Sequence, residues 1–407
     1  MIKMIRIHEG TKADIPEIVD FLMRLHNQNK TDWFEVLADG RHPNNDVSNF
    51  IIAKDAEKIV ALTMYQPMTY SYCGKLLKGV RLEEVFCEPE YQKEGVLEKI
   101  LSKIAELSDK KGSLLELVFV GEYSFFDRLG YTFGIPCEGE GYTYIIESEE
   151  TKNEFSIEEA SDDDIPIITK LHERAFKRNL LTTAYGCSEI DYIKNLYNAS
   201  ASYPSKFYVI KSAAGKICGF FLTHLNIEAI YMMELDDDCS YHQIRPYLTE
   251  FYKRLGMDKI SVMLGKAHPI YTVFKGFYHQ KSLPEFGFVK VRNIPKFLLS
   301  ISQILSDRLA NSPYANLMSS FVVAMRNDGE AYKLDFVCGK LNDVTPVKMH
   351  FGQVFIERDR FIKMLFGRIS PIGIEGEAYM YNFENEDFRN IFEILFPKMP
   401  SHVMSLS

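Results

Sequence analysis

The chain has 407 residues, too many for one ordinary hydrophobic core, so we expect about three domains. Hydrophobic residues make up 46% and charged residues 25%, as in most globular proteins, and the net charge is −9. A negative chain disfavours nucleic acid or an anionic membrane as a partner, because both bind cationic faces.

Cysteine, histidine and hydrophobic patterns exclude further classes of protein. The seven cysteines are scattered without a CxxC pair, and the histidines show no metal-ligand spacing, so we expect reduced thiols and no metal. No run approaches the ~18 apolar residues of a membrane span, and residues 1–10 lack the apolar core of a signal peptide. These patterns predict a cytoplasmic protein.

The sequence near the N-terminus is repeated later in the chain. Residues 5–18 and 155–168 align without a gap, at an offset of 150 residues (157 minus 7). Each copy predicts a short strand, an aspartate N-cap (Asp14 or Asp164) and a helix with proline in its first turn. Two copies of one opening predict two domains of related fold.

The next informative stretch runs from Leu82 to Ile104. Leu82–Cys87 is typical of a strand, which Pro89 ends, and a polar loop leads to Gly95 and then to apolar residues at helical spacing. The N–H groups at the start of such a helix point outward at a positive dipole end, where a pyrophosphate binds. We interpret this stretch as a coenzyme A site.

The remaining elements complete three units. A helix over 96–111 is followed by the strand Leu114–Val120, an aromatic string at 125–131 and a hairpin around Gly139–Gly141. The second copy has three strand-like runs but then Asp236–Asp238 and no glycine, so its carboxylates would repel a pyrophosphate. From about residue 287 an α+β unit follows, and its apolar tail (residues 396–407) is expected to dock.

Two motifs carry a resemblance to a known family. Pro89–Leu101 resembles motif A of the GCN5-related N-acetyltransferases (GNAT), and Phe125–Tyr131 resembles the next motif, an aromatic pair followed by R-L-G-Y. Two such units and a small third one resemble the Eis-like branch. The resemblance implies an α/β (α+β) fold class: tandem GNAT folds with mixed, mostly antiparallel sheets flanked by helices, then a sterol-carrier-protein-like α+β domain. The expected domains are 1–150, which binds acetyl-CoA, 151–288, which lacks a phosphate loop, and 289–407, whose tail reaches the active site.

The resemblance also implies an acetyl-CoA-dependent N-acetyltransferase that moves an acetyl group to a primary amine by direct attack on the thioester. Implied coenzyme contacts are Val85, Phe86 and Cys87 for the pantetheine, Lys93, Glu94, Gly95, Val96, Leu97 and Glu98 for the pyrophosphate, and Gly121 and Glu122 beside the pantetheine arm. The base is the C-terminal carboxylate of Ser407. Trp33 and Phe34 lie where this fold shapes its acceptor site. The branch forms hexamers, so a homo-oligomer is expected.

The sequence departs from the branch at three places. An arginine-rich loop is replaced by Gln92-Lys93-Glu94, the terminal aromatic residue is a serine, and the tyrosine acid position is Phe126, which cannot donate a proton. Tyr123 is a possible substitute acid, and a tyrosine restored at 126 is expected to raise the rate if the cleft is catalytic.

The departures leave alternatives open. One is a degenerate, non-catalytic module of the same fold that holds acyl-CoA or a hydrophobic ligand. Another is aminoacyl transfer from tRNA, which the net charge disfavours. The acceptor, a small-molecule or peptide amine, stays open.

Overall fold

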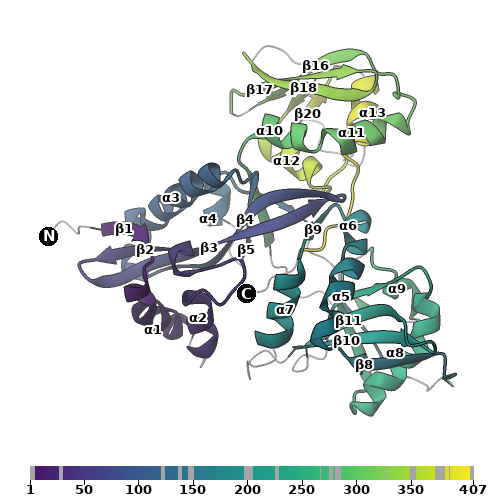
Figure 1. The fold of residues 1–407 in the computed structure, drawn as a ribbon. Helices are drawn as coiled ribbons and strands as arrows, with labels where there is room; N and C mark the ends of the chain where they lie inside the picture. The colour runs from purple at the N-terminus through teal and green to yellow at the C-terminus, as the bar shows by residue number, and fades with distance from the viewer. Residues whose placement is uncertain are drawn as a thin grey trace.

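The structure is a computed structural model of the chain, drawn in Figure 1. It describes all residues except 1–4, 27–30, 121–123, 136–139, 145–150, 197–204, 225–228, 266, 275–277, 280–285, 327, 349–353, 372–380, 385 and 404–407. The described part contains three β-sheets, each flanked by helices, which confirms the predicted fold class. No described helix is long and apolar enough to cross a membrane.

The first sheet has eight strands. Its order is β1 (Ile5–Glu9), β2 (Phe50–Asp55), β3 (Lys58–Tyr72), β4 (Lys75–Cys87), β5 (Leu115–Val120), β15 (Phe286–Val291) and β6 (Thr132–Ile135), with β9 (Leu181–Thr183) beside β3. Its helices are α1 (Ile15–His26), α2 (Thr31–Ala38), α3 (Val96–Lys111) and α4 (Ser124–Arg128). The predicted helix over 96–111 is therefore confirmed, and the strand predicted from Leu82 begins earlier, at Lys75.

The second sheet has seven strands and a related chain path. Its order is β14 (Tyr278–His279), β7 (Glu140–Tyr144), β13 (Lys259–Met263), β12 (Ala229–Leu235), β11 (Ile217–His224), β10 (Ser205–Ser212) and β8 (Phe155–Glu159). Its helices are α5 (Ile165–His172), α6 (Arg174–Arg178), α7 (Cys187–Leu196), α8 (Tyr241–Arg254) and α9 (Ile270–Val273).

The third sheet has five strands. Its order is β18 (Lys340–Val347), β17 (Ala331–Val337), β16 (Ser319–Met325), β19 (Val354–Ile356) and β20 (Tyr381–Phe383). It is accompanied by α10 (Ile294–Ser300), α11 (Ser302–Ala310), α12 (Arg358–Leu365) and α13 (Glu386–Leu395). Figure 1 shows this unit above the other two.

The first two sheets exchange one strand each. β15 lies between β5 and β6 of the first sheet, and β7 lies between β13 and β14 of the second. The hairpin predicted around Gly139–Gly141 is therefore wrong, because β6 and β7 belong to different sheets. The predicted third unit begins at residue 289, inside a strand that completes the first sheet.

Both copies of the opening motif fold in the same way. Thr11 donates from its backbone N–H and its hydroxyl to the Asp14 carboxylate, at 2.9 and 2.7 Å, and Ser161 does so to Asp164, at 2.7 and 2.8 Å. The two aspartates thus close reciprocal capping boxes with the residues three positions before them. Asp164 is the N-cap residue of α5, as predicted, but its side chain does not bond the first amides of that helix. This shared local structure agrees with the repeat.

The long β3–β4 hairpin joins the three units. Its turn uses Cys73 and Gly74, both at positive φ (47° and 91°), which suits a tight two-residue turn. At the tip, the Tyr72 hydroxyl donates to the Leu365 carbonyl of the third unit at 2.5 Å, and the Cys73 N–H donates to the Leu180 carbonyl of the second at 2.8 Å. The clusters of buried side chains are continuous across this junction.

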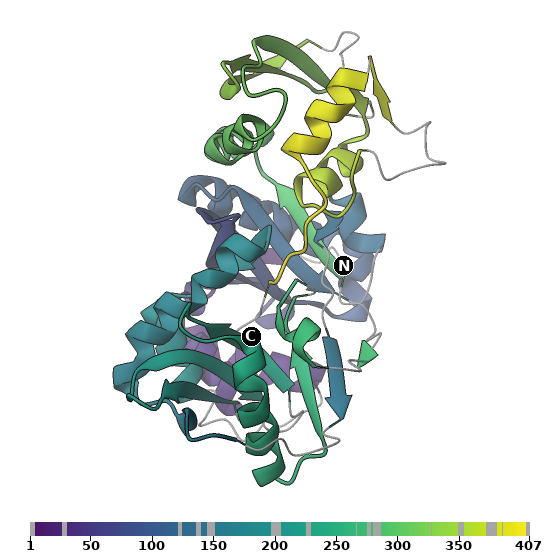
Figure 2. The ribbon, with the colours of Figure 1, turned by 90° about the vertical axis from the view of Figure 1, so that its right-hand side faces the viewer.

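The C-terminal tail, here residues 396–403, runs from α13 of the third unit down between the other two units (Figure 2). The Met399 N–H donates to the Gly367 carbonyl at 3.1 Å, the Leu180 N–H to the Pro400 carbonyl at 2.7 Å, and the His402 N–H to the Leu181 carbonyl at 2.8 Å. A side chain at Gly367 would lie 2.7 Å from the Met399 oxygen, so this glycine permits the close approach. The described tail is therefore docked, as its apolar composition predicts.

Candidate functional site

Strands β4 and β5 run side by side and then part. Their parallel pairing extends from Gly79 and Leu115 to Leu82 and Val118, whereas β4 continues to Cys87 and β5 to Val120. On its other edge β4 remains paired with β3 as far as Cys87. The last five residues of β4 therefore line an opening between two neighbouring strands of one sheet.

A β-bulge marks the point where the opening begins. The register of β3 and β4 shifts between Met64 and Leu62, and Glu84 has a φ of 51°, in the left-handed region. A bulge of this kind bends the strand and increases its twist, which turns the end of β4 away from β5. Beside the bulge, the buried Arg81 forms an ion pair with Glu83.

The loop after β4 delivers the start of a helix to the same opening. Residues 89–94 form a 3-10 turn, and Gln92 donates from its side chain to the Cys87 carbonyl at 3.3 Å. Gly95 follows with φ 68° and ψ 26°, a conformation that favours glycine, and α3 starts at Val96. Gly95 is the N-cap residue and has no side chain to bond the first N–H groups of the helix, so these amides are available to an anion.

The side chains around this helix start are mostly acidic. Lys93, Glu94 and Glu98 are exposed, whereas Val96 is fully buried under the sheet. Burial, followed by the neighbouring carboxylates of the loop and helix, raises the pKa of the Cys87 thiol to about 11. The thiol is therefore neutral near pH 7 and is a poor nucleophile.

The structure places most of the coenzyme contacts implied by the sequence in one region. Val85, Phe86 and Cys87 form the end of β4, and the residues from Lys93 to Glu98 form the loop and the first turn of α3. The implied contacts Gly121 and Glu122 lie outside the described residues, directly after β5.

Of the three implied catalytic positions, the structure describes only Phe126. Tyr123 and Ser407 lie outside the described residues. Phe126 is only 4% exposed, and its ring packs against those of Phe125, Tyr131 and Phe288 at centroid distances of 5.1, 5.5 and 6.2 Å. A hydroxyl added at position 126 would enter an apolar cluster, so we no longer expect a tyrosine there to raise the rate.

The two predicted acceptor residues lie on α2. Phe34 is fully buried in the cluster beneath α1, so its side chain belongs to the core, and the side chain of Trp33 lies outside the described part. A nearby histidine is more informative. His42 is 3% exposed, lies 2.9 Å through Nε2 from the Gln66 side-chain nitrogen, and packs against Tyr192 of the second unit, with the ring centroids 4.4 Å apart and the ring planes tilted by 57°. It forms part of the contact between the first two units.

Within the described residues, no group of histidine, cysteine, aspartate and glutamate side chains is arranged to hold a metal ion.

The second unit has an equivalent helix start, but its N-cap residue has a side chain that bonds the helix. Its helix α8 begins after Ser240, whose hydroxyl accepts from the Gln243 N–H at 3.3 Å while the Gln243 side chain accepts from the Ser240 N–H at 2.9 Å. Asp236 and Asp238 precede it. The Gln243 N–H, one of the first amides of α8, is thus bonded by the protein itself, and this helix start is a poorer anion site than that of α3. That this unit binds no nucleotide-type cofactor stays a prediction.

Comparison with known proteins identifies the first unit and the whole fold. Residues 6–134 match the family model described as an acetyltransferase (GNAT) domain. No curated protein sequence matches the chain. Several solved structures are similar over its whole length, including three from Enterococcus faecalis, Anabaena variabilis and Mycobacterium abscessus. A probable N-acyltransferase of unknown function from Enterococcus faecalis has a TM-score of 0.74 at 12% identity and covers 99% of both chains.

The second of these structures is a GCN5-related N-acetyltransferase from Anabaena variabilis, with a TM-score of 0.74 at 10% identity, covering 98% of this chain and 99% of that one. The third is Eis1 from Mycobacterium abscessus, with a TM-score of 0.67 at 11% identity and 98% of both chains covered. At such identities the likeness shows the fold. It confirms the tandem arrangement that the motifs implied.

Proposed function

We propose that the chain, with its match to the acetyltransferase (GNAT) domain model at residues 6–134 and an Eis-like fold over its length, is a member of the GNAT superfamily and transfers an acetyl group from acetyl-CoA to a primary amine. One observation carries the proposal. The opening between β4 and β5 ends at a helix start whose N-cap is Gly95, so a strand edge for an amide-rich arm lies beside amides for a pyrophosphate.

Acetyl-CoA fits this arrangement in two parts. The pantetheine arm contains amide groups, which can pair with the backbone of Val85–Cys87 as an added strand would. The pyrophosphate would meet the N–H groups of Val96, Leu97 and Glu98, with Lys93 as the nearest cation of the loop. Backbone N–H groups near the end of β4 would polarise the thioester carbonyl.

We propose direct transfer without an acyl-enzyme. The neutral amine nitrogen attacks the thioester carbon, the carbon–sulfur bond breaks, the coenzyme leaves as a thiolate, and a base takes the proton from the amine. Cys87 is the described thiol at the end of β4, and its raised pKa disfavours a covalent intermediate on it.

The proposed base is the terminal carboxylate of Ser407. The described part of the tail supports this choice, because His402 pairs in parallel with Thr182, so the tail has the direction of β9 where its description ends. That strand is antiparallel to β3, so its direction leads from Ser71 toward Gln66, which pairs with Arg81 just before the opening. Five residues beyond His402 can span about 17 Å. Tyr123 is the proposed substitute for the acid that Phe126 cannot supply.

We also propose the division into units 1–150, 151–288 and 289–407, with β7 and β15 exchanged between the first two, a sterol-carrier-like third unit, and a homo-oligomeric assembly as in the Eis-like branch. The acceptor is a small-molecule or peptide amine.

One alternative has a specific observation in its favour. The carboxylates around the start of α3 and the buried Phe126 suit a module that holds an acyl-CoA or hydrophobic ligand without chemistry. Release of the coenzyme thiol in the presence of a panel of amines separates the two functions, because the module releases none above background.

Deleting Leu406 and Ser407 tests the base. We expect turnover to fall about 100-fold or more, the lower end of what general bases contribute, while acetyl-CoA binding is unchanged. Ser407→Ala is the matched control, because it keeps a carboxylate at the same position and should keep the wild-type rate. Unchanged turnover after the deletion would exclude the tail carboxylate as the base.

A further inference from the structure

The second unit contains its own counterpart of the opening between β4 and β5. Strands β12 and β13 pair in parallel at Ala229 with Ser261 and at Ile230 with Val262, and β12 then continues to Leu235 paired with β11 but no longer with β13. These are the positions that the repeat makes equivalent to the pairing of β4 with β5, which ends at Leu82 and Val118. We call this opening the second cleft.

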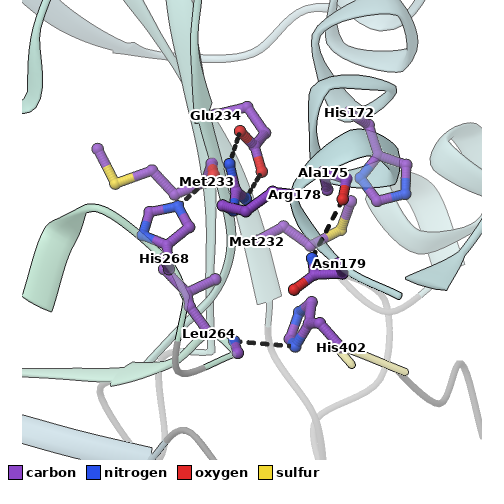
Figure 3. A pocket seen from close by; sticks show the side chains of 11 residues that line it. His172, Ala175, Arg178, Asn179, Met232, Met233, Glu234, Leu264, His268 and His402 are labelled. Carbon is purple, nitrogen blue, oxygen red and sulfur yellow. Dashed lines mark hydrogen bonds and ion pairs between the residues drawn. The ribbon is translucent and has the colours of Figure 1, made fainter. Parts of the chain in front are cut away.

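Side chains of the protein fill the second cleft. Arg178 of α6 forms a bidentate ion pair with Glu234 of β12, and His268, after β13, lies 2.9 Å through Nε2 from the Met233 carbonyl and 3.2 Å from the Tyr241 hydroxyl. A small pocket remains, lined by these two strands' ends, by α6 and by His402 of the tail (Figure 3). The tail is thus one wall of the second cleft.

The contacts of His402 are specific. Its Nδ1 accepts a hydrogen bond from the Gly265 N–H at 3.2 Å, and its backbone N–H donates to Leu181 at 2.8 Å. A side chain at Gly265 would lie 3.0 Å from the His402 Cβ and 3.4 Å from the Asn179 Oδ1, so the glycine lets the tail approach closely. Figure 3 shows the imidazole pointing toward the loop after β13.

The protonation of the imidazole agrees with this geometry. An Nδ1 that accepts from a backbone N–H carries no proton, so the ring is neutral. Burial, with the charge of neighbouring His172 and Arg178, lowers the pKa of His402 to about 4. Burial likewise lowers the pKa of His172 to about 4.

We propose that His402 is a positioning residue: it anchors the tail in the second cleft and thereby fixes the place and the direction, parallel to β9, from which the last residues of the chain set out. This role rests on the proposed function, because it is the last residues of the chain that take part in catalysis. The second cleft, closed to a coenzyme, then serves as the receptor for the chain's own tail.

The direction of the tail at His402 supports the proposed positioning role. Thr182 pairs with His402 on one side and with Ser71 of β3 on the other, and the Ala184 N–H donates to the Thr69 carbonyl at 2.9 Å. A chain parallel to β9 therefore advances toward lower residue numbers in β3. Those residues pair with the part of β4 where its contact with β5 ends.

The test replaces His402 by leucine, which removes the acceptor, and by asparagine, whose side-chain oxygen restores one near the Nδ1 position. We expect His402→Leu to lower kcat about tenfold or more with an unchanged KM for acetyl-CoA, because the catalytic end is misplaced and the coenzyme cleft is not touched. His402→Asn should recover most of the rate. Lys398→Ala, an exposed position in the same tail, is the control and should behave as wild type.

Hydrogen–deuterium exchange measured by mass spectrometry supplies the readout that does not need activity. Exchange should rise in His402→Leu in the peptides that contain Leu180 and Gly265, whose N–H groups bond the tail, and in the tail itself, while the remaining peptides exchange as in the wild type. Faster exchange there without a fall in kcat would overturn the positioning role, and unchanged exchange would overturn the anchor. Absence of turnover in the wild-type protein with all amines would instead overturn the proposed function and leave His402 a structural contact only.

Discussion

The first two units follow the same path and differ in what occupies the opening between their two diverging strands. In the first unit the helix beyond the opening starts at Gly95 with no side-chain cap, whereas in the second Ser240 and Gln243 cap each other. The opening in the first unit is followed by the turn at residues 89–94. The opening in the second unit is filled by Tyr241, His268 and the tail. On the proposed function, one scaffold thus provides a coenzyme cleft in one copy and a docking site for the tail in the other.

The difference arises from a few residues at equivalent positions. Gly95, in the left-handed region, brings no side chain to the first amides of α3, whereas the hydroxyl of Ser240, in the extended region, accepts from one of the first amides of α8. The strands and their divergence are common to both units. On the proposed function, the helix start and not the shared scaffold therefore decides which copy binds a coenzyme.

Among substitutions at the opening between β4 and β5, which we call the first cleft, Gly95→Ala is expected to have the largest effect on acetyl-CoA affinity. A side chain in the left-handed region costs about 1–2 kcal/mol, and the strain here displaces the amides that bind the pyrophosphate. We expect acetyl-CoA affinity to fall about tenfold. Gly112→Ala is the matched control, because Gly112 ends the same helix at φ 72° with open space around it. It should lose similar stability and keep the wild-type affinity, and equal losses of affinity would contradict the account.

A smaller effect of opposite sign is expected from Glu94→Gln. Removing an anion beside the start of α3 should strengthen acetyl-CoA binding about two- to fivefold, and the gain should shrink as salt is added. Glu106→Gln, an exposed position in the middle of the same helix, is the control and should change nothing. Titrations at low and moderate salt measure both variants. Weaker binding after Glu94→Gln would show that this carboxylate assists the coenzyme.

Much of the first cleft could be predicted from sequence because it is local. The strand ending at Cys87, the glycine at 95 and helix α3 follow one another along the chain, and their residue types specify them. The repeat could be recognised for the same reason. The bulge at Glu84 could not, because a positive φ at a glutamate depends on how β4 fits against β3 and β5.

Local sequence patterns could not predict the exchange of β7 and β15 or the place where the tail docks. Both strands have ordinary strand composition, and their partners lie more than a hundred residues away, so only the tertiary structure decides which sheet they enter. His402 belongs to no motif, and its partner Gly265 follows a strand in a different unit. The apolar composition of the tail predicted that it docks, but it did not predict the docking site.

We propose that each chain has one coenzyme cleft, in its first unit, and a calorimetric titration of the purified protein with acetyl-CoA at moderate salt is the experiment to do first. We expect one acetyl-CoA to bind per chain, more weakly in Gly95→Ala and with wild-type affinity in His402→Leu. Two molecules per chain, binding that survives Gly95→Ala unchanged, or no binding up to millimolar acetyl-CoA would rule out a single cleft in the first unit.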